Sequence, residues 1–118
     1  MTSIKLHKLL HHKLLQRIIN DGYGMRGKSK WIIESIDMFL ALPDYPTLVD
    51  IADNMDQLSE IVSIRLPEEL LDKIDQAIIA IRRLYPVMEG VKSNLVRASI
   101  IQRLLREPTS VTEVDVTY

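Results

Sequence analysis

Cysteine is absent from this 118-residue sequence, and aromatic side chains are scarce, with one Trp, one Phe and four Tyr. The lack of cysteine excludes disulfides and thiolate zinc sites. The longest apolar runs are a few residues, far short of a membrane span, and the first residues lack the continuous apolar stretch of a signal peptide. We therefore expect one compact cytoplasmic domain with no membrane partner, built around Leu, Ile, Val and Met.

Positive charge is missing from the middle of the chain, although the net charge is only −1. Residues 37–60 hold six acidic residues and no basic one, whereas residues 1–36 hold seven Lys or Arg and two acidic residues. A basic opening third is suited to facing a polyanion, but solvated helix faces explain the same charges. Charge alone leaves both interpretations open.

The stretch GYGMRGKSK at residues 22–30 contains the Gly, Gly, Lys and Ser of a phosphate-binding P-loop. A P-loop follows a buried strand and opens a helix. The apolar residues before this stretch recur instead at helical spacing, namely Leu6, Leu10, Leu14, Leu15, Ile18 and Ile19. We therefore predict no nucleotide hydrolysis, no other enzyme activity and no cofactor.

An internal repeat organises the chain. Residues 3–19 align with residues 63–79 at an offset of 60, with eight identities. After a four-residue insertion the offset becomes 64, and Lys28-Ser29 aligns with Lys92-Ser93. The Lys-Ser of the P-loop pattern is therefore half of a duplicated feature.

Each copy predicts the same order of elements: a short alternating strand, a helix, a loop with Gly or Pro, and a second helix. The expected strands cover residues 2–6 and 61–66, the first helices about 8–20 and 68–84, and the second helices end near Leu42 and Arg106. We predict that Ser29 and Ser93 are the N-caps of the second helices.

The two copies define the expected organisation of the chain. Residues 1–42 form the first repeat, 43–59 an acidic linker, 60–107 the second repeat and 108–118 a tail. In the linker, a capping-box-like start at Thr47 predicts a short amphipathic helix through Met55 and Leu58, which either packs on the bundle or docks a partner. The polar tail is expected to lack regular structure or to add a strand to a neighbour.

Strand, helix, helix, twice over, resembles the ribbon-helix-helix family of DNA-binding proteins. The second copy, VSIRLPEELLDKIDQAI followed by VKSNLVRASIIQRLL, carries the closer match. The resemblance implies a mainly α fold with a short two-stranded antiparallel ribbon, in which one chain forms an intramolecular pseudo-dimer that relatives form as homodimers. Tandem members of the family include TraY-like relaxosome proteins and AcaB-like plasmid transfer activators.

The resemblance also implies where DNA is bound. A two-stranded ribbon fits the major groove of double-stranded DNA, and by alignment its base contacts are Ser3, Lys5, Ile61, Ser63 and Arg65. Helix N-termini attract phosphate, which assigns phosphate contacts to Lys28, Ser29, Lys30, Lys92, Ser93 and Asn94. The alternative is a solvent-facing hairpin whose charges guard its edges.

The implied function is sequence-specific transcription regulation, encoded on a plasmid or mobile element. The alternatives are a relaxosome accessory role at a transfer origin, and an antitoxin or protein-interaction module without DNA. Expected partners are double-stranded DNA, a second copy on DNA and a component of the transcription or conjugation machinery. His7, His11 and His12 include an i,i+4 pair but no nearby carboxylate in the sequence, so we predict no metal site.

Overall fold

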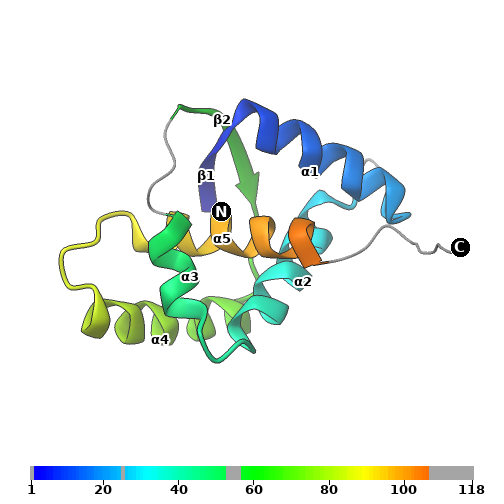
Figure 1. Ribbon diagram of the computed structural model, residues 1–118. Coiled ribbons are helices and arrows are strands. Elements are labelled where there is room, and N and C mark those ends of the chain that lie inside the picture. The colour runs from blue at the N-terminus through cyan, green and yellow to red at the C-terminus, as the bar shows by residue number, and fades with distance from the viewer. Residues whose placement is uncertain (1, 25, 53–56, 107–118) are drawn as a thin grey trace, which may run out of the picture.

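The computed structural model describes residues 2–24, 26–52 and 57–106. Strand, helix and helix follow one another twice, with a further helix between the two sets (Figure 1). The strands are β1 (Thr2–His7) and β2 (Leu58–Ile64), and the helices are α1 (Lys8–Asn20), α2 (Lys28–Leu40), α3 (Tyr45–Ala52), α4 (Glu68–Leu84) and α5 (Val91–Arg106). β1 and β2 pair as a two-stranded antiparallel sheet, which confirms the expected mainly α fold with a short ribbon.

The register of the ribbon coincides with the internal repeat. Ser3 pairs with Ser63, its own equivalent at the offset of 60. The pairs on either side, Ile4 with Val62 and Thr2 with Ile64, exchange places under the same offset. The axis that relates the two copies therefore passes between Ser3 and Ser63.

The strand bounds differ from the expected ones. β1 continues to His7 and pairs with the start of β2 at Leu58 across an irregularity between Leu6 and His7. At the other end, the last described pair is Thr2 with Ile64. β2 therefore begins three residues before the expected strand 61–66 and ends two residues before its end. Arg65 follows directly after the last residue of β2.

One face of the ribbon is covered by the helices. The inward side chains Ile4, Leu6, Val62 and Ile64 are at most 2% exposed. α5 packs against both β1 and α2, and the latter contact joins the two repeats through buried residues that include Trp31, Ile32, Ile36, Leu95, Val96 and Ile100. The core therefore contains residues of both copies, each of which is too small to bury a sufficient core by itself.

Two buried serines show the same pseudo-symmetry inside the core. Ser35 and Ser99 are equivalent at the offset of 64, and both are 1% exposed. The Ser35 hydroxyl donates to the Trp31 carbonyl at 2.7 Å, and the Ser99 hydroxyl donates to the Leu95 carbonyl at 2.8 Å. Each buried hydroxyl is thus satisfied within its own helix.

The second helices begin before the predicted serine N-caps. Gly27 caps α2, which starts at Lys28, and α5 starts at Val91. The N-cap assignments of Ser29 and Ser93 are therefore wrong, because both residues already lie in the first helical turn. Gly27 approaches Tyr23 so closely that an added Cβ would lie 2.4 Å from the Cβ of that residue, which gives this glycine a packing role without a nucleotide.

α3 breaks the symmetry between the two copies. It begins at Tyr45, two residues before the expected start, and its described part ends at Ala52, while Leu58 belongs to β2. Its inward residues Val49 and Ala52 are buried where α3 packs on α4 and α5. The predicted packing of the linker helix on the bundle is thus confirmed, whereas Met55 and the tail 108–118 lie outside the described residues.

Candidate nucleic-acid interface

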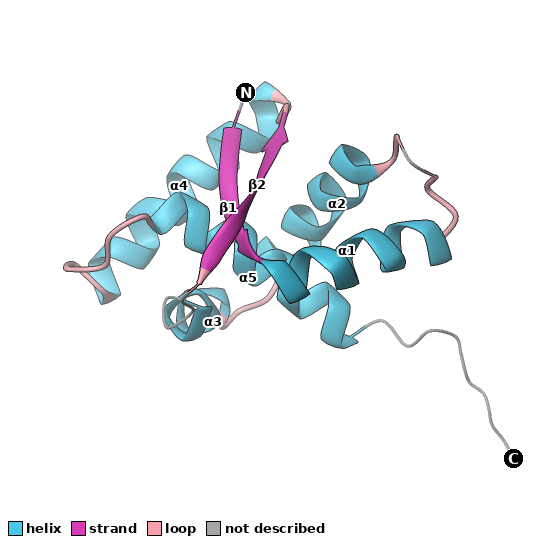
Figure 2. Cartoon of the chain, turned by 90° about the horizontal axis from the view of Figure 1, so that it is seen from above, coloured by secondary structure: helices cyan, strands magenta, loops and turns pink. Residues whose placement is uncertain are grey.

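The uncovered face of the ribbon gathers the five residues predicted to contact bases. Their side chains are all exposed, while the residues between them along the strands are buried or half-buried; the five are Ser3, Lys5, Ile61, Ser63 and Arg65. In Figure 2 the ribbon lies over α5, with α1 and α4 on opposite sides of it. The predicted alternation thus brings these side chains together on one surface.

Two cross-strand pairs form the middle of this surface. The hydroxyls of Ser3 and Ser63 are 3.0 Å apart, within hydrogen-bond distance. Lys5 pairs directly with Ile61, whose side chain is 64% exposed. The centre is therefore polar and nearly symmetric, while one side combines a cation with an apolar group.

The two cationic positions lie on opposite sides of the centre. Lys5 lies two residues beyond Ser3 along β1, and Arg65 lies two residues beyond Ser63 along the antiparallel strand. A strand rises about 3.4 Å per residue, so Lys5 and Arg65 are separated by about 14 Å along the ribbon. That distance corresponds to about four base-pair steps of roughly 3.4 Å in a DNA duplex.

The start of α2 presents the first predicted phosphate-binding group. Lys28 and Ser29 are half-buried and Lys30 is exposed, with its ammonium 5.8 Å from the centre of the Tyr23 ring. The Trp31 amide donates to the Gly27 carbonyl at 2.9 Å, which closes the first helical turn. Amides in a first turn have no partner inside their own helix, so they are suited to an anion.

At the start of α5, two of the three residues predicted to contact phosphate are accessible. Lys92 and Ser93 are half-buried and available at the helix start. Asn94 is 2% exposed, its amide nitrogen donates to the Glu89 carbonyl at 3.2 Å, and its oxygen accepts from Arg97. The prediction that Asn94 contacts phosphate is therefore wrong, because its side chain is buried in hydrogen bonds within the protein.

Arg97 links this helix start to the ribbon. Arg97 is 6% exposed, and its guanidinium donates to the Asn94 side chain and to the Lys5 carbonyl, the latter at 3.0 Å. The equivalent residue of the first repeat is Ile33, which cannot make these bonds. Sequence reasoning missed this contact, although the alignment of Arg97 with an apolar helix residue was a signal that its side chain points inward.

A second buried arginine fixes the loop that precedes α2. The Arg103 guanidinium lies 4.4 Å from the centre of the Trp31 ring, donates to the Trp31 carbonyl at 2.9 Å and to the Tyr23 hydroxyl at 3.1 Å. Tyr23 in turn donates to the Glu34 carboxylate, and this bond raises the pKa of Tyr23 above its usual value. Through Arg103, α5 thereby fixes Tyr23 in the loop that directly precedes Lys28 and α2.

The histidines near the ribbon have structural contacts. His7 Nδ1 accepts from the Leu9 amide at 3.1 Å and so caps α1. His11 Nδ1 lies 3.8 Å from a Glu60 carboxylate oxygen, so a carboxylate does accompany it, contrary to the expectation from sequence. Even so, no group of three or more His, Cys, Asp or Glu suited to a metal ion occurs within the described ranges.

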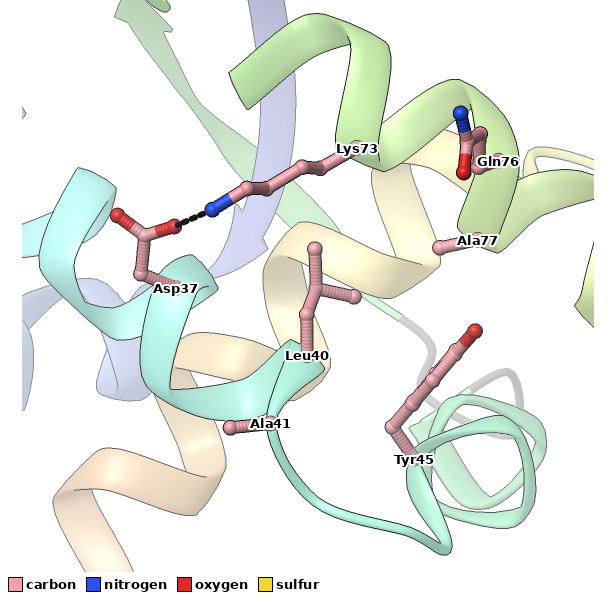
Figure 3. Close-up of a pocket in the computed structure, with 7 residues that line it drawn as sticks. All are labelled: Asp37, Leu40, Ala41, Tyr45, Lys73, Gln76 and Ala77. Carbon is pink, nitrogen blue, oxygen red and sulfur yellow. Dashed lines mark hydrogen bonds and ion pairs between the residues drawn. The ribbon is translucent and has the colours of Figure 1, made fainter. Parts of the chain in front are cut away.

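An open groove of about 440 Å³ lies between the end of α2, the start of α3 and α4 (Figure 3). Lys73 and Asp37 meet across it at 3.5 Å in a solvent-exposed ion pair, and Leu40 and Tyr45 supply its apolar part. A second groove contains the equivalent residues Lys13, Gln16 and Leu104. The grooves therefore follow from the repeated packing of a first helix against a second helix of the other copy.

Along the part of the chain that the structure describes, no helix is long and apolar enough to cross a membrane. No protein-family model, curated protein or solved structure matches the chain.

Proposed function

We propose that this protein is a sequence-specific DNA-binding regulator of transcription that reads the major groove with its ribbon. The observation that carries the proposal is the register that pairs Ser3 with Ser63 and leaves five groove-compatible side chains on one uncovered face. An antiparallel ribbon of two strands has the dimensions of the major groove.

The contacts follow from the chemistry of the exposed side chains. Arg65 is suited to a bidentate bond with the O6 and N7 of guanine, Lys5 supplies a point charge, and Ile61 is suited to a thymine methyl. Ser3 and Ser63 donate to or accept from base edges near the pseudo-twofold axis. The α2 and α5 starts then hold the DNA backbone through Lys28, Ser29, Lys30, Lys92 and Ser93.

The biological setting follows from the resemblance to tandem ribbon-helix-helix proteins. It supports a cytoplasmic regulator encoded on a plasmid or mobile element, with the transcription or conjugation machinery as a further partner. The same ribbon would serve a relaxosome accessory protein at a transfer origin, which is the alternative role.

Alanine substitution of Arg65 tests the proposal. Removing a bidentate base contact should cost about 1–3 kcal/mol of specific binding and relax the preference at one base pair. Fluorescence anisotropy with selected and scrambled duplexes measures both effects, and Arg83→Ala at the exposed end of α4 is the matched control. An equal loss of affinity for both duplexes would show that Arg65 does not read bases.

A further inference from the structure

The open groove lined by α2, α3 and α4, which we call the α2–α4 groove, differs in charge from the equivalent second groove (Figure 3). Both grooves contain the same lysine, Lys73 in the first and Lys13 in the second. The α2–α4 groove adds the carboxylate of Asp37, whose equivalent at the offset of 64 is Ile101. Among the described residues that line the second groove, none is acidic. Of the two grooves, the α2–α4 groove is therefore the one that presents both charges to a ligand.

The two charges of this groove are accessible and weakly committed to each other. The Lys73 ammonium lies 3.5 Å from an Asp37 carboxylate oxygen, and the two side chains are 65% and 49% exposed. An ion pair this exposed contributes little to stability, so a ligand that opens it does so at small cost. A ligand with an ammonium and a carboxylate on the same carbon offers each of these residues its opposite charge.

The floor of the groove beside the ion pair is apolar. Leu40, Ala41 and Ala77 line it together with Tyr45, whose side chain points toward α4 in Figure 3. The Tyr45 ring is held by Phe39, with 6.1 Å between the ring centres. The volume of about 440 Å³ lies within the range of small-ligand sites, about 300–1,000 Å³. The groove therefore has room for an apolar side chain next to its two charges.

We propose that the α2–α4 groove binds a free α-amino acid with an apolar side chain, such as leucine or phenylalanine. The ammonium of the ligand binds Asp37, its carboxylate binds Lys73, and its side chain packs on Leu40 and the Tyr45 ring. A concave, partly apolar site with a few convergent polar groups is the usual form of a small-molecule site.

This site goes beyond the proposed function. Asp37 and Leu40 lie at the end of α2, whereas Lys28 lies at its start, about 18 Å away at 1.5 Å per residue. The residues that line the groove are also distinct from those on the exposed face of the ribbon. One chain can therefore hold the amino acid and DNA at the same time, and the amino acid acts as an effector rather than as a competitor of DNA.

A ligand series tests the site without DNA, so a failure here leaves the proposed function standing. In NMR titrations of the isotope-labelled full chain, leucine and phenylalanine at millimolar concentration should shift the signals of the groove residues and reach saturation. Leucinamide lacks the carboxylate and 4-methylpentanoate lacks the ammonium, so each should bind about tenfold more weakly than leucine. The proposal is overturned if neither amino acid binds, or if either analogue binds as tightly as leucine.

Two substitutions test whether the ligand lies between the paired charges. Asp37→Asn and Lys73→Met each remove one charge, so each should weaken leucine binding by about tenfold. Because the pair is exposed, both variants should fold like the natural chain. The matched controls are Asp75→Asn on α4 and Lys13→Met in the second groove, which should bind leucine normally. Normal binding by either groove variant, or an equal loss in its control, would overturn the proposal.

Discussion

The hydroxyls of Ser3 and Ser63 are 3.0 Å apart at the position where the repeat places a residue against its own equivalent. At other equivalent positions near the ribbon, the two repeats carry different side chains. Lys5 on one side corresponds to Arg65 on the other, and the Arg97 that bonds to the Lys5 carbonyl corresponds to Ile33. The strand that carries Lys5 is therefore anchored to α5 by a contact that its counterpart lacks.

Substituting Arg97 by Ile, the residue at the equivalent position of the first repeat, tests this anchor. Loss of the guanidinium removes its bonds to the part-buried Lys5 carbonyl and to the Asn94 side chain, which should lower the free energy of unfolding by about 1–3 kcal/mol. Because the ribbon is then less firmly placed, we expect affinity for a selected duplex to fall more than affinity for random DNA.

Urea unfolding and competition binding measure the two effects of Arg97→Ile. Arg83→Ala, which removes an exposed cation from α4, is the control and should change neither quantity. A normal unfolding midpoint with unchanged sequence preference would contradict the positioning role of Arg97.

Burial explains which site residues the sequence could not place. Lys92, Ser93 and Asn94 look alike as polar residues at a helix start, but Asn94 faces Glu89 and Arg97 and is 2% exposed. That difference depends on how α5 packs against β1, which no local pattern encodes. The ribbon residues were predictable because a strand alternates its faces with a period of two.

At the scale of elements, α2 and α5 begin with the duplicated Lys-Ser. The strands and four of the helices were predictable from apolar spacing, and α1 and α4 have the expected bounds. The starts of α2 and α3 were not predictable, since α2 begins directly after Gly27, which closely approaches Tyr23, and α3 is positioned by its packing on α4 and α5. The phosphate-loop pattern follows α1 rather than a strand, as the helical spacing of the preceding apolar residues predicted.

Alanine substitution of Lys28 or Lys92 should weaken binding to all DNA sequences alike, because a phosphate contact carries no base information. Each substitution should reduce the slope of log affinity against log salt by about one. Lys73→Ala, at an exposed lysine paired with Asp37, is the control. A calorimetric signal for ATP with Mg²⁺ that Lys28→Ala abolishes would instead restore the P-loop interpretation.

At the scale of the whole molecule, one chain supplies both strands of the ribbon and both halves of the core. The smallest folded unit should therefore be a single chain, and its unfolding should not depend on protein concentration when the protein is dilute. Light scattering and thermal unfolding over a wide dilution range test this expectation. An obligate dimer whose stability rises with concentration would point to strand exchange between chains.

The central claim is that a nearly symmetric ribbon reads DNA with two unlike halves. Selection of bound duplexes from a random pool tests it most directly, using the full chain at moderate salt. We predict a non-palindromic site whose firmest position is a G·C pair under Arg65, with a weaker preference under Lys5 about four base pairs away. A perfectly palindromic site, or a pool with no enriched sequence, would contradict the account.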